Sequence, residues 1–514
     1  METVLKLEGV TKVFPKVVAC DSIDLDLRKG EVHVLLGENG AGKSTLMNCI
    51  YGMYTPTSGR FYVNGEEVHI HNSEQAIELG IGMVHQHFML VPQLTAAENI
   101  ILGLKSDNEP LLNLEQAEKK IKALSDKYRF GIDPKEKIRN MAVGMQQRVE
   151  ILKLLYRKAE ILILDEATAV LTPQEAQELF QVVRQLTKEG KSVLMITHNL
   201  EEVMSLADRV TVLRDGKVAG KVNRADTTPR ELANLMVGRD VLFDFKTTDE
   251  EPGDVLLEAE NLTVIDDRKI PRVKNVSFQV RAGEVFAIAG VDGNGQIELS
   301  EALTGLRPFK QGHVSIKGKK YTKLKVREAY EHGVSHIPQD RQKTGLVMEL
   351  SIKKNMILTD NYREPYSKRG IIDYKKVTDH GTKMVGEYDV RTPSCEVPAK
   401  ELSGGNQQKV ILARELCREP DVLVAVQPTR GLDIGAIEFV RQKILDQRAR
   451  GAAVILVSTE LDEIFQVADR IAVMHEGEFM GVVRNGEVTV NEIGLMMAGT
   501  RKEQAVSQTE GGVE

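Results

Sequence analysis

The chain has 514 residues, which is more than one hydrophobic core usually supports, so we expect two or three domains. Its residues are 42% hydrophobic and 28% charged, a globular composition that argues against disordered and fibrous classes. A formal net charge of -7 argues against a broadly basic surface for nucleic acid. The N-terminus has no signal-peptide pattern and no apolar run approaches the roughly 18 residues of a membrane span, which predicts a cytosolic chain. Four well-separated cysteines without a CxxC pair predict small buried residues rather than a zinc site.

The first motif in chain order is a phosphate-binding loop. "GENGAGKST" follows the apolar run "EVHVLL" and precedes the helical pattern "STLMNCIYG", the context that GxxxxGK[ST] requires. The glycines let backbone N–H groups face a polyphosphate, Lys43 neutralises its β and γ oxygens, and the Ser44 hydroxyl can ligate Mg²⁺. The predicted ATP-binding residues are Gly37, Glu38, Asn39, Gly40, Ala41, Gly42, Lys43, Ser44 and Thr45.

A pair of carboxylates ends the later apolar run "ILILDEAT". Asp165 is suited to hold the magnesium ion or its water, and Glu166 to orient or deprotonate an attacking water. His198, in "ITHNL" after the next predicted strand, can contact the γ-phosphate. Between them, Thr172 can cap a helix that stops at Gly190. These patterns place the acidic residues at the carboxyl edge of an α/β sheet, where such sheets bind ligands.

The second half of the chain repeats the first. "RKGEVHVLLGENGAGKSTL" is answered by "RAGEVFAIAGVDGNGQIEL", and "GMQQRVEILKLLYRKAEILILDEAT" by "GNQQKVILARELCREPDVLVAVQPT", in the same order. Acidic residues, Pro252 and Gly253 interrupt the pattern between the halves. We therefore predict homologous domains at residues 1–245 and 254–498, a linker at 246–253 and a disordered polar tail at 499–514.

"LSGGNQQ" in the second half resembles the signature loop of ATP-binding-cassette (ABC) ATPases. With the phosphate-binding loop, the carboxylate pair and His198, it makes the chain similar to two such cassettes fused in tandem. The resemblance implies an α/β fold of two P-loop NTPase domains, each with a mainly parallel core sheet, an antiparallel β subdomain and a helical subdomain, using ATP and Mg²⁺. By the same resemblance Gln86 touches magnesium, and Phe14 stacks on adenine unless it belongs to the core.

Cassettes of this family pair head to tail, so each ATP lies between the P-loop of one half and the signature loop of the other. The resemblance therefore implies one complete site, closed by Leu402, Ser403, Gly404, Gly405, Asn406 and Gln407. The other site is degenerate, with Gln296, Ile297, Val426, Gln427 and Thr459 in place of the reacting groups. Its signature loop, "MAVGMQQ" from the first half, has Val143 where a glycine is expected. Because every departure falls in one composite site, we predict one active site and one inactive site.

The tandem arrangement resembles the ATP-binding subunits of bacterial importers for monosaccharides and nucleosides, and "VGMQQRVEILKLLYR" and "QPTRGLDIGAIEF" are closest to the nucleoside branch. This implies a peripheral ATPase on the cytoplasmic face of the inner membrane, two integral-membrane permease subunits, an extracytoplasmic substrate-binding protein and no nucleic acid. Residues 87–90 either receive a permease segment or simply fill the helical subdomain.

The alternatives are the same role in a monosaccharide importer of the ribose, galactose or xylose type, or a tandem cassette protein without a transport function. A ribosome-associated protein of that kind would carry two complete sites and a long charged linker. A DNA-repair ATPase would carry inserted zinc-binding cysteines or long coiled coils. Neither pattern is present in this sequence.

Overall fold

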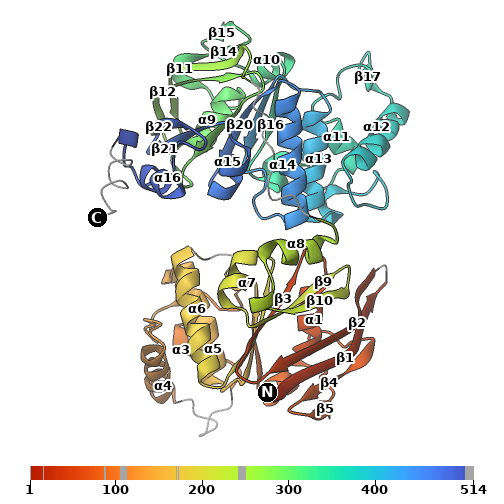
Figure 1. Cartoon of the computed structure of the whole chain (residues 1–514), viewed down its shortest axis with the longest axis vertical. Helices are drawn as coiled ribbons and strands as arrows, with labels where there is room; N and C mark the ends of the chain where they lie inside the picture. Colours follow the sequence, from red (N-terminus) through yellow and green to blue (C-terminus); the bar gives the residue numbers. More distant parts are fainter. Residues whose placement is uncertain are drawn as a thin grey trace. The chain divides into compact units, whose positions relative to one another are not determined.

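The structure, a computed structural model, describes residues 2–15, 17–85, 88–104, 113–168, 171, 173–240 and 251–503. It divides into two compact units, Met1–Val241 and Leu242–Glu514 (Figure 1). Each unit has its own buried hydrophobic residues. Most of the linker expected at 246–253 and of the tail expected at 499–514 lies outside the described residues.

A mainly parallel sheet forms the centre of the first unit. Over the described residues its strand order is β10-β9-β3-β8-β7-β6, and the β9–β10 pair is its antiparallel pair. The strands are β3 (Val32–Gly37), β6 (Ile81–Val84), β7 (Ile161–Asp165), β8 (Ser192–Thr197), β9 (Arg209–Arg214) and β10 (Lys217–Asn223). Every residue of β3, β7 and β8 is buried, which explains why their sequences are continuous apolar runs. These apolar runs therefore form strands of the α/β sheet that the sequence predicts.

An antiparallel sheet packs against this core through helix α1 (Lys43–Ile50). In order β2-β1-β4-β5, the described strands of that sheet are β1 (Thr3–Phe14), β2 (Val17–Arg28), β4 (Ser58–Val63) and β5 (Glu66–Val68). Leu46, Met47 and Ile50 of α1 share one buried cluster with residues of both sheets. This packing fixes the first turn of α1 relative to the carboxyl end of β3, with the loop of residues 38–42 between them.

The other described helices of the first unit are α2 (Ser73–Glu78), α3 (Ala96–Ile101), α4 (Leu114–Lys127), α5 (Val143–Tyr156), α6 (Pro173–Lys188), α7 (Leu200–Leu206) and α8 (Pro229–Val237). Helices α3, α4 and α5 contact one another and form the helical subdomain. Helix α6 ends shortly before Gly190, whose φ of 90° fits the predicted stop. Thr172, the predicted cap of α6, lies outside the described residues.

The second unit repeats this architecture. Its core strands are ordered β22-β21-β13-β20-β19-β16, matching the first unit strand for strand over the described residues. They are β13 (Val285–Ala289), β16 (Val334–Ile337), β19 (Val422–Val426), β20 (Ala453–Ser458), β21 (Arg470–His475) and β22 (Glu478–Arg484). The antiparallel sheet consists of β11 (Val255–Ile265), β12 (Pro271–Arg281), β14 (Phe309–Ile316) and β15 (Lys319–Tyr321), and β17 (Ser367–Lys368) pairs with β18 (Ile371–Ile372) in a separate hairpin.

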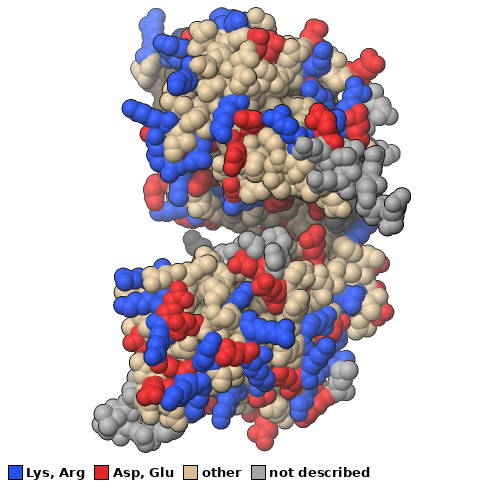
Figure 2. Space-filling model, turned by 90° about the vertical axis from the view of Figure 1, so that its left-hand side faces the viewer, with Lys and Arg blue, Asp and Glu red and all other residues tan. Residues whose placement is uncertain are grey.

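Helices of the second unit are α9 (Gln296–Leu303), α10 (Val326–Glu331), α11 (Ile352–Met356), α12 (Tyr374–Glu387), α13 (Gly404–Leu416), α14 (Ile434–Ala449), α15 (Leu461–Val467) and α16 (Val490–Met497). The predicted fold class is confirmed in both units: a mainly parallel core sheet, an antiparallel sheet and a helical subdomain. Basic and acidic side chains are interspersed over the face drawn in Figure 2. Among the described helices, none combines the length and apolar character needed to cross a bilayer.

Candidate nucleotide site

The phosphate-binding loop of the first unit joins the end of β3 to the start of α1. Gly42 has a φ of 99°, and a Cβ there would lie 2.2 Å from the carbonyl oxygen of Ala19, so only glycine fits. Lys43 Nζ donates to the carbonyl oxygens of Gly37 (2.8 Å) and Glu38 (2.9 Å). Ser44, one residue later, is exposed. The lysine side chain thus lies inside the loop, whereas the serine is accessible from outside it.

Asp165 ends strand β7 at the same edge of the sheet. Only 5% of its surface is exposed, and its Oδ1 atom has no hydrogen-bond partner among the described residues. Burial, together with the neighbouring Glu166 carboxylate, raises the pKa of Asp165 to about 6, while Lys43 and a hydrogen bond with Ser44 act in the opposite direction. A buried carboxylate oxygen without a partner, beside a serine hydroxyl, is a donor set that suits Mg²⁺.

Glu166 and His198 face each other across the ends of β7 and β8. His198 Nδ1 lies 3.2 Å from Glu166 Oε1. The hydrogen bond with His198 is the main reason that the pKa of Glu166 is lowered, although burial opposes it. Glu166 also has a φ of 47°, and its backbone N–H donates to the carbonyl oxygen of Ile196 at 3.1 Å. The carboxylate is therefore ionised at neutral pH, beside an imidazole, and able to accept a proton.

The corresponding loop of the second unit keeps the backbone and changes the chemistry. Gly295 has a φ of 106°, close to that of Gly42, and α9 begins at Gln296. Gln296 Nε2 donates to the carbonyl oxygen of Val291 at 3.0 Å. Val291 is the counterpart of Glu38, so the glutamine amide replaces one of the bonds that Lys43 makes. Unlike Lys43, it brings no positive charge to the loop.

The carboxyl end of β19 likewise lacks reacting groups, because Val426 and Gln427 stand where the first unit has Asp165 and Glu166. Gln427 Nε2 donates to Asp292 Oδ1 at 2.7 Å, and Arg430 Nη1 lies 3.2 Å from Asp292 Oδ2 and 3.0 Å from Gln427 Oε1. The polar groups here therefore bind one another. Val426 is buried and Ile297 is 37% exposed, and neither provides a ligand for a metal.

The signature loop of the second unit leads into helix α13. Asn406 Nδ2 donates to Ser403 Oγ at 2.9 Å, and Asn406 Oδ1 accepts the backbone N–H of Arg391 at 2.7 Å. Gln407 is 2% exposed, and its amide donates to the carbonyl oxygens of Ala399 and Leu402. Asn406 and Gln407 therefore brace the loop from inside.

A family model described as "ABC transporter" matches residues 20–169 and 273–430, one stretch in each unit. The chain belongs to the ABC transporter family. It is 48% identical over 498 residues to the nucleoside import ATP-binding protein NupA of Lactococcus lactis subsp. cremoris, covering 97% of this chain and 98% of the relative. It is 50% identical over 505 residues to the guanosine import ATP-binding protein NupO of Bacillus subtilis, covering 98% and 99%. It is 44% identical over 528 residues to the glucose import ATP-binding protein TsgD13 of Haloferax volcanii, covering 97% and 96%.

Membership of the ABC transporter family makes the chain an ATP-binding protein whose ATP hydrolysis is coupled to transport. Of the residues predicted for its sites, Gln86 lies outside the described part of the chain. Phe14 is half-buried at the end of β1, where its ring meets the edge of Tyr54 at 5.6 Å and Lys12 Nζ lies 5.3 Å from the ring centre. The structure thus places Phe14 at the margin of the antiparallel sheet rather than in the buried core.

Sequence reasoning missed three side chains at these loops. Asp292 and Arg430 hold the closed polar cluster of the second unit. Glu202 accepts hydrogen bonds from Thr168, two residues after Glu166, and from Thr197, directly before His198. A signal for Glu202 was present. In the aligned segments "ITHNLEEV" and "VSTELDEI", its counterpart remains glutamate although the counterpart of His198 has become Thr459.

Proposed function

We propose that this ABC ATPase energises the import of nucleosides, using one working ATP site. The observation that carries the proposal is a set of five side chains in the first unit: Lys43 in the loop, Asp165 beside Ser44, and Glu166, whose Oε1 lies 3.2 Å from His198 Nδ1. Nearly full-length similarity to two proteins named for nucleoside or guanosine import supports the cargo.

In the proposed reaction, the loop from Gly37 to Thr45 binds the phosphates of ATP through its backbone N–H groups and Lys43. Ser44, Asp165 and Gln86 would hold Mg²⁺, which neutralises charge on the β- and γ-phosphate oxygens when bound. Glu166 orients a water molecule for in-line attack and accepts its proton. His198 holds the carboxylate in place and faces the γ-phosphate. Phe14 is proposed to stack on the adenine ring.

The complete site in this proposal also needs the signature loop of the second unit, Leu402 to Gln407. Its serine and glycines would approach the γ-phosphate from the other side, in the head-to-tail pairing of the family. The phosphate-binding loop of the second unit, with Gln296 and Ile297, would form the inactive site together with Val426, Gln427 and Thr459. The polar groups of that loop already bind one another, which supports a structural role there.

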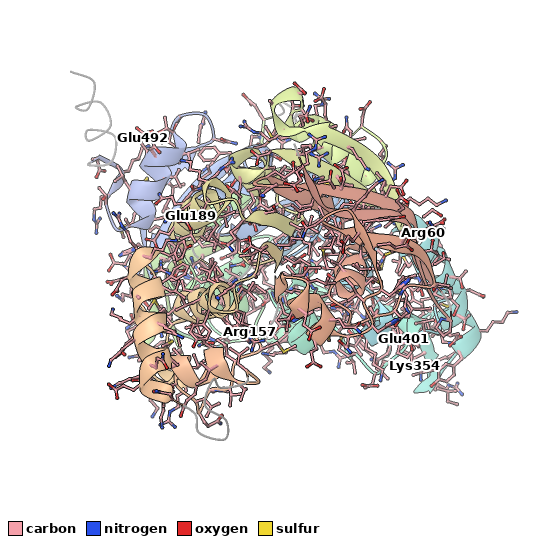
Figure 3. The ribbon with its side chains drawn as sticks, turned by 90° about the horizontal axis from the view of Figure 1, so that it is seen from below. Arg60, Arg157, Glu189, Lys354, Glu401 and Glu492 are labelled. Carbon is pink, nitrogen blue, oxygen red and sulfur yellow. The ribbon has the colours of Figure 1, made fainter. Side chains whose placement is uncertain are left out.

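The permease is proposed to dock near residues 87–90. Met89 is 60% exposed, and a cavity of about 310 Å³ lies beside it, lined in part by Tyr51, Met53 and Arg157. Arg157, labelled in Figure 3, donates to the carbonyl oxygen of Leu102 at 2.7 Å. The exposed methionine and this cavity support contact with a permease at this place. The assembly that we propose has two integral-membrane permease subunits and an extracytoplasmic substrate-binding protein, as expected for import ATP-binding proteins. The ATPase would then lie at the cytoplasmic face of the inner membrane, without a nucleic acid partner.

A monosaccharide cargo is the second candidate, because the relative named for glucose import is 44% identical over nearly the whole chain. Uptake of labelled nucleosides and monosaccharides by cells lacking this chain separates the two cargoes. We expect loss of nucleoside uptake, restored by the wild-type chain and not by Lys43→Ala. Loss of pentose or hexose uptake instead would keep the mechanism and change the cargo. Unchanged uptake of every compound would contradict the importer role.

A further inference from the structure

The carboxylate of Glu202 connects the segment that carries Glu166 to the segment that carries His198. Glu202 lies in the first turn of α7 and is partly buried. Thr168, two residues after Glu166, donates its hydroxyl to Glu202 Oε1 at 2.5 Å. Thr197, directly before His198, donates its hydroxyl to Glu202 Oε2 at 2.6 Å. One carboxylate therefore links the segment after β7 to the last residue of β8, directly before His198.

The direction of the Thr197 bond is fixed by a further contact. The backbone N–H of Asn199 donates to Thr197 Oγ1 at 3.0 Å, so the hydroxyl proton is directed toward Glu202. Asn199 in turn caps α7, with its side chain accepting the backbone N–H of Glu201 at 2.8 Å. The loop that carries His198 is thus held on both sides, by the helix cap and by the carboxylate.

The second unit contains the same arrangement without the catalytic pair. Thr429 Oγ1 donates to Glu463 Oε1 at 2.8 Å, and Ser458 Oγ donates to Glu463 Oε2 at 2.6 Å. The backbone N–H of Glu460 donates to Ser458 Oγ at 3.1 Å, as Asn199 does to Thr197. The two copies therefore differ in what they position, Glu166 and His198 in one unit and Gln427 and Thr459 in the other.

We propose that Glu202 is a positioning residue for ATP hydrolysis, which sets the Glu166–His198 geometry by tying Thr168 to Thr197. This inference rests on the proposed function. Glu202 touches neither Glu166 nor His198 through any hydrogen bond described in the structure, and it acts through the two threonines. Bonds from neutral donors to a carboxylate are stronger than bonds between neutral groups, so this link resists the separation of the two loops. Burial raises the pKa of Glu202, whereas the two threonine hydroxyls and His198 act against that rise.

Hydrolysis by the full chain, in membranes that contain its transporter, tests the proposal. Glu202→Ala and the isosteric Thr168→Val should each lower kcat about 10- to 100-fold, because a displacement of reacting groups by about 1 Å can cost about 10²-fold in rate. The KM for ATP should stay unchanged because the phosphate-binding loop is not altered. Thr168→Ser keeps the hydroxyl and should retain most of the activity.

The second unit provides matched controls. Glu463→Ala and Thr429→Val remove the same bonds and should lower the melting temperature by a similar amount, yet leave kcat unchanged. Equal losses of kcat in both units would show a general structural role and overturn the inference. Wild-type kcat in Glu202→Ala and Thr168→Val, with Glu166→Gln inactive, would overturn it as well. Activity in Glu166→Gln would instead contradict the catalytic assignment on which the inference rests.

Discussion

Glu166 and Gln427 have the same backbone conformation at the ends of equivalent strands, with φ values of 47° and 44°. Each donates its backbone N–H to the strand beside it, Glu166 to Ile196 at 3.1 Å and Gln427 to Val457 at 2.7 Å. A positive φ is costly for residues other than glycine, so its retention in both units indicates that the surrounding fold imposes it. The two side chains then lie in equivalent places, but the carboxylate faces an imidazole and the amide faces Asp292.

Replacement of that carboxylate should stop hydrolysis without unfolding the protein. Glu166→Gln keeps the size of the side chain and removes the group that accepts the proton, so kcat should fall about 10²- to 10⁴-fold. Gln427→Ala in the second unit should leave kcat unchanged, because that position provides no base. Steady-state ATP hydrolysis measures both. Normal turnover by Glu166→Gln would contradict the model with one active site.

Asp165 should make the nucleotide-free protein less stable at neutral pH. Its pKa is raised to about 6 in the folded state, above its value near 3.9 in an unfolded chain. Between these values the folded state binds more protons, so stability falls as pH rises through this range and stays lower above it. Asp165→Asn removes the ionised form and should increase the free energy of unfolding at pH 8 by roughly 1 to 3 kcal/mol.

Urea denaturation of the nucleotide-free protein at several pH values checks the expectation for Asp165→Asn. The gain in stability should disappear below about pH 4, where Asp165 is protonated in both states. The variant should also lose ATP hydrolysis that depends on Mg²⁺. The carboxylate of Asp165, whose Oδ1 atom has no hydrogen-bond partner among the described residues, is then replaced by an uncharged amide. Equal stability of variant and wild type at pH 8 would show that the burial of this carboxylate carries no cost.

A reciprocal exchange between the two loops should change activity in one unit alone. Lys43→Gln should fold, since Gln296 shows that a glutamine amide can bond inside such a loop, and it should abolish hydrolysis because the charge on the phosphates is no longer neutralised. Gln296→Lys should add no second hydrolytic site, because Val426 and Gln427 lack the carboxylates. Circular dichroism and ATP hydrolysis measure the two effects. An increase in turnover for Gln296→Lys would contradict the inactive assignment.

Much of the fold and part of the site follow from the sequence for identifiable reasons. The runs that form β3, β7 and β8 are apolar throughout because these strands are buried on both faces, so their pattern is strong. The loop at Gly37 to Thr45 is predictable because its backbone admits few residue types: a Cβ at Gly42 would lie 2.2 Å from the carbonyl oxygen of Ala19.

Contacts between side chains far apart in the chain were not predictable in the same way. Arg430 and Asp292 are separated by more than a hundred residues, and their pairing depends on the register of β19 and β13 in the sheet. Thr168 and Glu202 are ordinary residue types for a turn and a helix, and their link emerges only when β7 and β8 lie side by side. Periodicity predicts which face of an element is buried, but it does not specify such polar pairs.

The head-to-tail pairing of the two units can be tested by exchanging one residue between their signature loops. Val143, at the start of α5, is 46% exposed, and Gly404 holds the equivalent place at the start of α13. A Cβ at Gly404 would come 3.2 Å from Arg341 Nη2, the far end of a flexible side chain, so Gly404→Val should fold.

If this loop completes the site of the first unit, the added side chain should block the approach to ATP and lower kcat about 10²-fold, although no residue of the first unit is changed. Val143→Gly should leave kcat unchanged, since in the proposed pairing its loop would face the inactive site. The reverse result, with Val143→Gly altering turnover and Gly404→Val having no effect, would contradict this pairing, because the loop of the first unit would then serve the active site.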